Sequence, residues 1–298
     1  MRSGFAVLAG RPNVGKSTLV NRLVGEKVSI VAASPNTTRR AVHGVVRREG
    51  VQLVLVDTPG LHRPRSALGR RLNDAAQHAL EDADAIVAML DATSPIGPGD
   101  RHVLAALLRA AQRGPAPFVV VNKVDRARRA SVAAALLAAQ GAVGELAAEL
   151  GSDRAASRAE YYAVSAREGE GTEALLDGLV ATLGEGPEWF GPTERSDVED
   201  EERIAELVRE ALLAEVRDEL PHSLHCRTRS VDWPVVAVDV LVERESQKPI
   251  VIGRRGQVLK RAGSAARAQL PEGCYLELRV VVEPHWQSRD DVLDRWGY

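Results

Sequence analysis

Short apolar runs alternate with longer amphipathic stretches over the first 184 residues of the chain. Six runs have the length and composition of strands, at residues 5–9, 42–47, 51–56, 85–90, 118–121 and 161–164. Helix-like stretches lie between them, near residues 16–25, 67–81, 100–113, 130–150 and 172–183. Several runs are apolar at successive positions, as in a strand that is covered on both faces. The pattern predicts an α/β domain with a mostly parallel six-stranded sheet.

The pattern changes near residue 184. Glycines and prolines gather within residues 184–192, and six acids with one arginine follow within residues 194–202. We expect a solvated linker at residues 185–202, between a first domain of residues 1–184 and a second of residues 203–298.

The second domain is patterned differently. Apolar residues recur at helical spacing over 204–216 and alternate with polar ones near 224–229, 236–242 and 276–282. A helical stretch at residues 247–269, interrupted by glycines 253 and 256, lies between the last two runs. This α-β-β-α-α-β order predicts an α+β domain with helices on one face of a sheet.

Composition narrows the class of protein. The 298 residues are 45% hydrophobic and 27% charged, which excludes a disordered chain, and two cysteines exclude a disulfide framework. We find no apolar run near the 18–20 residues that span a bilayer and no signal peptide, so we expect a cytoplasmic protein. The net charge of −2 means that a nucleic-acid site has to be a local basic patch.

A phosphate-binding loop follows the first predicted strand. The G-x-x-x-x-G-K-S pattern stands between a strand and a helix, as this motif requires, and its residues with the next one are Gly10, Arg11, Pro12, Asn13, Val14, Gly15, Lys16, Ser17 and Thr18. The backbone N–H groups and the helix N-terminus suit phosphate oxygens. We expect Lys16 to neutralise the β and γ phosphates and Ser17 to bind Mg²⁺.

Three further motifs follow the ends of later strands. Their candidate nucleotide-binding residues are Asp57, Thr58, Pro59 and Gly60 with the following Leu61; Asn122, Lys123, Val124 and Asp125; and Ser165 with Ala166. We expect Asp57 to hold Mg²⁺ and the Gly60 N–H to reach the γ phosphate. The Asp125 carboxylate can accept from N1–H and the 2-amino group of guanine, a donor pair that adenine lacks. Lys123 can pack on the base, and the Ser165–Ala166 backbone can meet guanine O6.

In this order the four motifs resemble those of the Ras-like GTPase superfamily, which implies GTP and GDP as ligands. The loop between the first predicted helix and the second strand, which this superfamily calls switch I, contains Thr37 and Thr38. We expect Thr38, rather than Thr37, to complete the Mg²⁺ shell. The candidate catalytic residues are Lys16, Thr38, Gly60 and Asn13. Leu61 stands where many relatives carry a glutamine that orients the attacking water, so we expect slow intrinsic hydrolysis. Resemblance to GTPases with T-T-R in switch I implies that Asn13 helps to bind K⁺ near the phosphate that is transferred. The alternative is that Asn13 only rigidifies the phosphate loop.

A second candidate site lies in the C-terminal domain. Gly253, Arg254, Arg255 and Gly256 form a G-x-x-G between two helices, and seven of the eight charged residues in 244–267 are basic. With the predicted element order, this segment resembles a type II KH domain, which binds single-stranded RNA. We expect RNA contacts from Lys248, Ile252, Gly253, Arg254, Arg255, Gly256, Gln257, Lys260 and Arg261.

The whole chain resembles a bacterial family that joins a GTPase domain to a type II KH domain. Residues 219–223 and 245–248 strengthen the resemblance. It implies a monomer that binds 16S rRNA near its 3′ end and assists assembly of the small (30S) ribosomal subunit. It also implies peripheral membrane association, although the sequence shows no basic amphipathic helix. Glu277 and Glu283 in the last strand depart from the family pattern and lower the RNA affinity that we expect.

Two other interpretations stay open. Another K⁺-dependent bacterial GTPase, acting in tRNA modification or carrying tandem GTPase domains, is disfavoured by the single nucleotide domain and the KH segment. An RNA-binding assembly protein whose nucleotide is mainly structural would share every motif, and only the measurement of GTP turnover would distinguish it.

Overall fold

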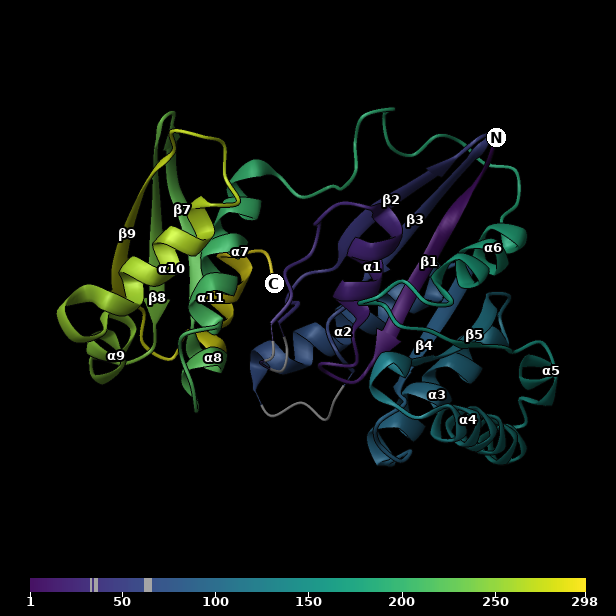
Figure 1. Ribbon diagram of the computed structural model, residues 1–298. Helices are drawn as coiled ribbons and strands as arrows, with labels where there is room; N and C mark the ends of the chain where they lie inside the picture. The colour runs from purple at the N-terminus through teal and green to yellow at the C-terminus, as the bar shows by residue number, and fades with distance from the viewer. Residues whose placement is uncertain (33, 35–36, 62–65) are drawn as a thin grey trace. The chain divides into compact units, whose positions relative to one another are not determined.

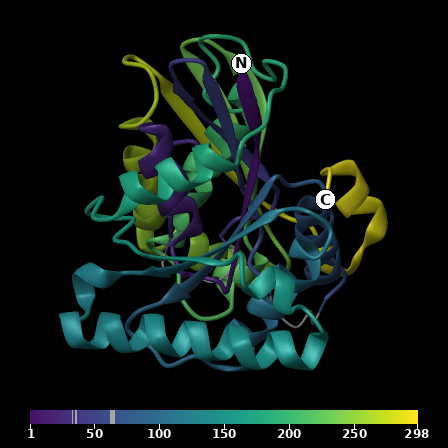
Figure 2. The same cartoon turned by 90° about the vertical axis from the view of Figure 1, so that its right-hand side faces the viewer.

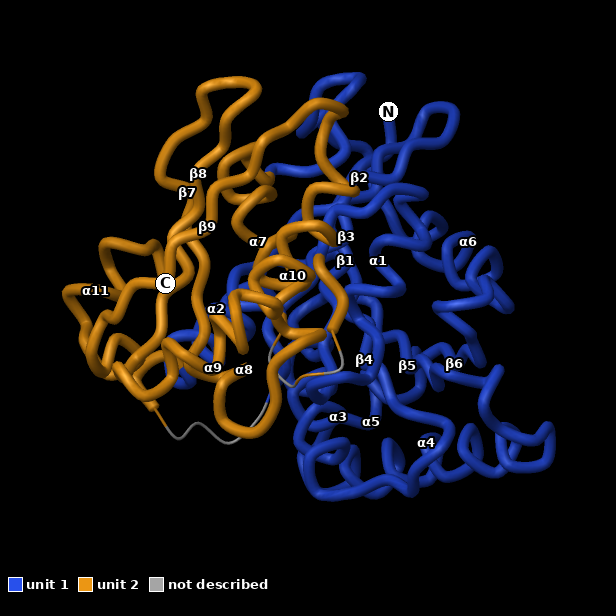
Figure 3. The backbone as a smooth tube through the Cα atoms, turned by 60° about the vertical axis from the view of Figure 1, so that its left-hand side comes forward, with its two compact units in different colours: residues 1–29, 38–64, 69–197 blue, residues 30–37, 65–68, 198–298 orange. Residues whose placement is uncertain are grey.

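The computed structural model describes residues 1–32, 34, 37–61 and 66–298. Its contacts divide the chain into two compact units, coloured in Figure 3. The first unit comprises Met1–Ser29, Thr38–Pro64 and Gly69–Asp197, and the second comprises Ile30–Thr37, Arg65–Leu68 and Val198–Tyr298. Each unit has its own hydrophobic core.

The first unit is built on a six-stranded sheet, which confirms the predicted fold class (Figure 1). Its strands are β1 (Arg2–Gly10), β2 (Val42–Arg48), β3 (Val51–Asp57), β4 (Ala85–Asp91), β5 (Ala116–Asn122) and β6 (Glu160–Ala163). The spatial order is β2-β3-β1-β4-β5-β6, and β2 alone among these strands runs antiparallel, against β3. The carboxyl ends of the parallel strands therefore meet at one edge, where a ligand site is expected.

Helices cover both faces of this sheet. They are α1 (Lys16–Val24), α2 (Ala67–Glu81), α3 (Pro98–Ala111), α4 (Arg129–Leu150), the short α5 (Asp153–Ala156) and α6 (Thr172–Thr182). Buried residues of α1 and α6 share one core with the sheet, and buried residues of α2, α3 and α4 share the other. Strand β3 is buried at all seven positions, as its continuous apolar run predicted.

Helix α4 corrects one expectation from the sequence. Over Arg129–Leu150 it is long and apolar enough, by length and composition, to cross a membrane (Figure 2). Alanine supplies most of its apolar character, which is why no run of large apolar residues stands out in the sequence. Its buried residues, among them Val143 and Leu146, pack in the core with α3, and 28% of its most apolar window is buried.

The stretch that we predicted as a linker contains two kinds of structure. Residues before Val198 bind the first unit: the Trp189 N–H donates to Gln52 Oε1 at 2.7 Å, and the His43 N–H donates to Asp197 Oδ1 at 3.0 Å. From Asp200 on, the acids form the first turn of helix α7 (Asp200–Leu213), where negative charge suits the positive end of the helix dipole.

The second unit is the predicted α+β domain. Strands β7 (His225–Asp232), β8 (Val235–Val242) and β9 (Tyr275–Val282) form a sheet in that order, with β8 antiparallel to β7 and parallel to β9. The helices are α7, α8 (Leu220–Ser223), α9 (Lys248–Ile252), α10 (Gln257–Arg267) and α11 (Asp290–Arg295). The sequence pattern predicted neither α8 nor α11. Helix α11 ends in an aromatic cluster in which the Trp296 ring stacks on His225, with 4.5 Å between ring centroids.

Candidate functional site

The phosphate loop turns at Gly15, directly before helix α1. Gly15 has a φ of 106°, and a Cβ there would lie 2.3 Å from Nδ2 of Asn122. Only glycine adopts this positive φ readily and also leaves the space beside Asn122 empty. The Asn122 side chain donates to the carbonyl oxygen of Val14 at 2.8 Å. The first residue of the N-K-x-D motif therefore holds the phosphate loop in place.

Lys16 is buried beneath the loop, with its Nζ 3.2 Å from the carbonyl oxygen of Gly10. Desolvation lowers the pKa of this ammonium, and the negative charge of Asp57 opposes the shift. A buried cation surrounded by carbonyl oxygens favours an anion nearby, which is the role we predicted for Lys16 toward phosphate.

Three oxygen-bearing side chains converge beside Lys16. The Thr38 hydroxyl donates to Asp57 Oδ2 at 3.2 Å and lies 3.1 Å from the Ser17 hydroxyl. Asp57 is 0% exposed, burial raises its pKa, and among the described residues its Oδ1 has no hydrogen-bond partner. Hydroxyl and carboxylate oxygens are ligands that Mg²⁺ prefers. The unsatisfied oxygen thus fits a divalent cation held by the three residues that we predicted as metal ligands.

The D-x-x-G segment lies against the phosphate loop. A Cβ on Gly60 would lie 2.9 Å from the Pro12 nitrogen, so a side chain has no room there. The Thr58 hydroxyl donates to the carbonyl oxygen of Leu8, and the Leu61 N–H donates to that of Gly10 at 3.2 Å. The Leu61 side chain is 2% exposed and belongs to the core. Position 61 therefore presents no polar group to a water molecule.

The predicted base-binding residues meet at the ends of β5 and β6. The Lys123 ammonium donates to the Asn13 carbonyl oxygen at 2.8 Å, and the Ser165 hydroxyl donates to Asp125 Oδ1 at 2.6 Å. Val124 follows in a single 3-10 turn. The Ala166 N–H, which we assigned to guanine O6, donates to Asn122 Oδ1 at 2.9 Å in this structure.

Sequence reasoning missed Asp91 at the end of β4. Its Oδ2 lies 2.6 Å from Lys123 Nζ. Burial alone would raise the pKa of Asp91, but the hydrogen bonds from Lys123 and Thr93 lower it. An ionised Asp91 thus positions the Lys123 side chain. Its place at the carboxyl end of a predicted strand was the available signal.

The G-x-x-G loop of the second unit has the backbone that its glycines allow. Gly253 has a φ of 76°, and a Cβ there would lie 2.5 Å from Val258 Cγ2. Arg255 and Gly256 also have positive φ, of 53° and 75°. Helix α10 begins directly afterwards at Gln257, so its N-terminus faces the space beside the loop.

The predicted RNA-binding cations divide into two groups. Arg261 Nε donates to Glu215 Oε2 at 2.8 Å, which raises the pKa of the guanidinium. Within the described ranges, the other predicted cations, Lys248, Arg254, Arg255 and Lys260, form no side-chain hydrogen bond or ion pair. Ile252 is half-buried at the end of α9. Four cations are thus available for an anionic ligand, and Arg261 already has a partner.

Gln247 is a second residue that sequence reasoning missed. It is buried just before α9, its Oε1 accepts from the Glu243 and Arg244 N–H groups, and its Nε2 donates to Ser223 Oγ at 3.0 Å. It therefore fixes the entry into the α9–α10 hairpin. A single glutamine in a polar stretch gives no local signal for this role.

The fold and the two sites define a P-loop GTPase with a KH domain. The family described as "50S ribosome-binding GTPase" matches residues 5–123, and the KH domain family matches residues 220–287. Curated relatives named GTPase Era are similar over nearly the full length: 42% identity in Mycolicibacterium paratuberculosis, covering 100% of this chain and 99% of the relative, and 41% in Mycobacterium tuberculosis H37Rv, covering 99% and 98%.

Solved structures agree with these relatives. Era in complex with MgGDPNP and nucleotides 1506–1542 of 16S ribosomal RNA matches with a TM-score of 0.86 and 32% identity, over 100% of this chain and 99% of that one. An Aquifex aeolicus Era variant bound to GDP and AlF₄⁻ matches with the same values. The chain belongs to the GTPase Era family, and its enzymatic activity is the hydrolysis of GTP to GDP and phosphate.

Hydrolysis should be faster in K⁺ than in Na⁺. Asn13 lies in the phosphate loop with a φ of 62°, and the buried Leu61 brings no polar group to the γ phosphate. A monovalent cation beside Asn13 would stabilise the charge that develops in the transition state, as an arginine finger does. We expect kcat to be at least about tenfold higher in KCl than in NaCl of equal ionic strength. Equal rates in the two salts would contradict the hypothesis, and Asn13→Ala should remove the difference.

Proposed function

We propose that this chain is a GTP-dependent switch that binds single-stranded RNA near the 3′ end of 16S rRNA and assists assembly of the small (30S) ribosomal subunit. The observation that carries the proposal is the G-x-x-G loop at the start of α10, with exposed Arg254 and Arg255, which form no ion pair with any residue that the structure describes. Loops of this kind clamp the backbone of about four unpaired nucleotides. The Era structure with nucleotides 1506–1542 of 16S RNA supports this ligand.

The nucleotide ligands are GTP and GDP with Mg²⁺. MgGDPNP and GDP with AlF₄⁻ in the two Era structures support them. In this chain Ser17, Thr38 and Asp57 would hold the cation, Lys16 would bind the phosphates, and Asp125 would select guanine. When bound, Mg²⁺ neutralises charge on the phosphate oxygens.

A segment of the second unit supports coupling between GTP and RNA. Within that unit Arg209 of α7 is 0% exposed, binds the Glu206 carboxylate at 2.6 Å and donates to the carbonyl oxygen of Thr37. The Val31 N–H donates to Glu210 Oε1 of the same helix at 2.9 Å. Burial alone would lower the pKa of Arg209, but Glu206 outweighs it and raises the pKa. The segment that precedes Thr38 is therefore held by a charged anchor on α7.

Replacing Arg209 by methionine should uncouple RNA affinity from the bound nucleotide. Thr37 and Thr38 share a peptide bond, so a ligand that orders Thr38 acts on the segment that Arg209 holds. Typical couplings change affinity by about 5- to 150-fold, and we expect the ratio of RNA affinities with a GTP analogue and with GDP to fall toward one. Fluorescence anisotropy with each nucleotide measures this ratio. Arg217→Met, which removes an exposed arginine beyond the end of α7, should retain the ratio. An unchanged ratio in Arg209→Met would contradict the coupling.

The proposed function is tested by RNA binding of the full-length chain. A labelled single-stranded fragment of the 16S 3′ end should bind, and Gly253→Asp should abolish binding while leaving GDP affinity intact. Loss of both would indicate misfolding. GTP turnover in K⁺ with and without the RNA measures whether RNA binding changes the rate of hydrolysis.

We further propose that the chain acts as a monomer in the cytoplasm on the 30S subunit. Association with the inner face of the cell membrane stays a prediction of the family resemblance.

A further inference from the structure

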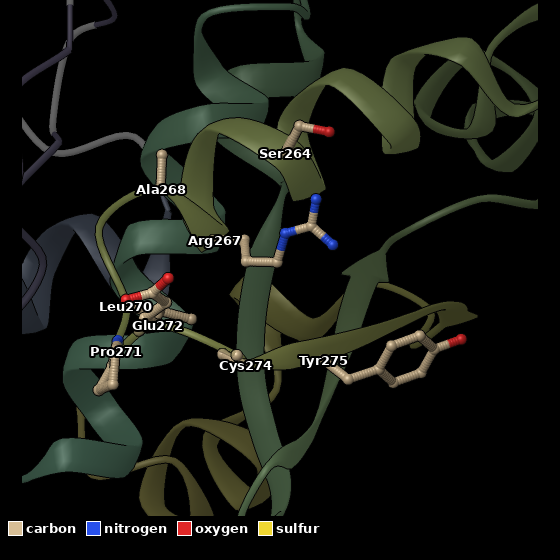
Figure 4. A pocket seen from close by; sticks show the side chains of 9 residues that line it. Ser264, Arg267, Ala268, Leu270, Pro271, Glu272, Cys274 and Tyr275 are labelled. Atoms are coloured by element: carbon tan, nitrogen blue, oxygen red, sulfur yellow. The ribbon is translucent and has the colours of Figure 1, made fainter.

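An open pocket of about 650 Å³ lies in the second unit, at the end of α10 opposite to the G-x-x-G loop. Its walls come from the last turn of α10, the loop that follows and the first residue of β9 (Figure 4). Its polar lining includes Ser264, Arg267, Glu272 and Tyr275. None of these residues belongs to the RNA site that we predicted.

Tyr275 presents an aromatic ring to solvent beside this pocket. Its side chain projects outward from β9 in Figure 4, and the residue is 58% exposed. Its N–H donates to the carbonyl oxygen of Pro234 at 2.7 Å, which fixes the start of the strand. In the described part of the chain the Tyr275 hydroxyl has no hydrogen bond. An exposed ring on a fixed strand offers a flat apolar face on which another planar group can stack.

Arg267 lines the same pocket and supplies an available cation. Across the described residues its guanidinium forms no hydrogen bond or ion pair, in contrast to Arg261 on the same helix. Lys260, Ser264 and Arg267 are spaced at i, i+4 and i+7, so they share one face of α10. This face runs from the G-x-x-G loop to the pocket, over about 16 Å of helix.

We propose that this pocket is a base-stacking subsite for the single-stranded RNA that the G-x-x-G loop clamps. The RNA strand follows the Lys260–Arg267 face, Arg267 binds a phosphate, and an unpaired base stacks on Tyr275. Proteins that bind single strands combine cations along the backbone with aromatic platforms in this way. Because every base has a π-face, the subsite adds affinity and length to the RNA site with little sequence preference. The inference rests on the proposed function.

Nested oligonucleotides test the proposal with the full-length protein. Fragments of the 16S 3′ end, from four to about twelve nucleotides, are titrated by fluorescence anisotropy. We expect Tyr275→Ala to weaken binding of the longer fragments by about 5- to 150-fold and to leave the four-nucleotide fragment unchanged. Tyr275→Phe should keep wild-type affinity. Arg267→Ala should lower the slope of log Kd against log[KCl] by about 0.7, because one phosphate contact is lost.

Two control variants carry substitutions in the first unit. Trp189→Ala removes an aromatic residue of similar exposure, 54%, from the first unit, and Arg113→Ala removes a surface arginine of that unit; neither should change RNA binding. Wild-type affinity of Tyr275→Ala for every length overturns the subsite, as does an equal loss at all lengths. Unchanged RNA affinity with weaker 30S binding would assign the pocket to a protein and overturn the RNA occupant. If wild type and Gly253→Asp bind equally weakly, the proposed function itself fails.

Discussion

Replacing Asp125 by asparagine should exchange the base preference of the nucleotide site. We expect affinity for GDP to fall by about a thousandfold and affinity for xanthosine diphosphate to rise. The Ser165 hydroxyl donates a hydrogen bond to Asp125 Oδ1 at 2.6 Å and thereby orients the carboxylate. Guanine offers two donors to this carboxylate. An asparagine amide in its place would point one of its own N–H groups at a guanine N–H, and no hydrogen bond can form between two donors. Xanthine carries a carbonyl at C2, which can accept from that amide.

Titration with fluorescent GDP and xanthosine diphosphate measures this exchange. Ser165→Ala is the matched control, because it removes the orienting hydroxyl and keeps the carboxylate. It should weaken GDP moderately without any gain for xanthosine diphosphate. An unchanged ratio of the two affinities in Asp125→Asn would show that Asp125 does not contact the base.

The elements that the sequence predicted well are those with strong periodicity and clear terminators. Helix α2 spans Ala67–Glu81, the predicted range, and α1 ends before Gly25, whose φ of 77° is the conformation in which helices commonly terminate. Strands β3, β4 and β5 are buried by helices on both sides, so their apolar runs are continuous and their type is clear. Helix α11 has only six residues, and its order depends on contacts with distant residues such as His225.

The residues of the candidate site also fall into those that the sequence predicts and those that it does not. The motif residues stand in contiguous strings, because one loop must present several backbone groups to one phosphate, and such strings can be read from the sequence. The residues that hold them come from distant segments. Asp91 holds Lys123 from another strand, and Gln247 braces the α9 hairpin from Ser223. Such pairs depend on tertiary packing, which local composition does not encode.

Arg209 shows why burial of charge is hard to predict. On the amphipathic pattern of α7 it reads as a solvent-facing cation, yet it is 0% exposed. A buried guanidinium is tolerated when its donors are satisfied by a carboxylate and a carbonyl oxygen, as Glu206 and Thr37 do here. The second partner lies in a segment 172 residues away. Only the fold brings the two together, and the same contact gives the switch segment its anchor.

Replacing Asp57 by asparagine should remove the metal site while preserving the fold. The amide of the Asp57→Asn variant would keep an acceptor oxygen for Thr38. Because the charge that opposes the desolvation of Lys16 is lost, we expect that ammonium to shift toward its neutral form and the fold to be kept. GTP hydrolysis should fall by about 10²- to 10³-fold, because the oxygen that fits the cation is lost. The dependence of GDP affinity on Mg²⁺ should disappear as well. Release of a fluorescent GDP analogue on adding EDTA measures the second effect without turnover.

The pH dependence of the wild-type protein supplies an independent check. Burial raises the pKa of Asp57, so this carboxyl binds a proton at a higher pH than an ordinary aspartate does. A protonated carboxyl is a poor Mg²⁺ ligand, and Mg²⁺ affinity should weaken as pH falls through that raised pKa. Asp84→Asn is the control. Asp84 accepts a hydrogen bond from the Phe5 N–H at 2.8 Å, at the edge of the sheet opposite to the phosphate loop. This variant should keep the wild-type Mg²⁺ dependence of GDP affinity and its weakening at low pH. If Asp57→Asn still showed Mg²⁺-dependent GDP release, the unsatisfied Oδ1 would have another explanation, and Ser17 and Thr38 would have to bind the cation without it.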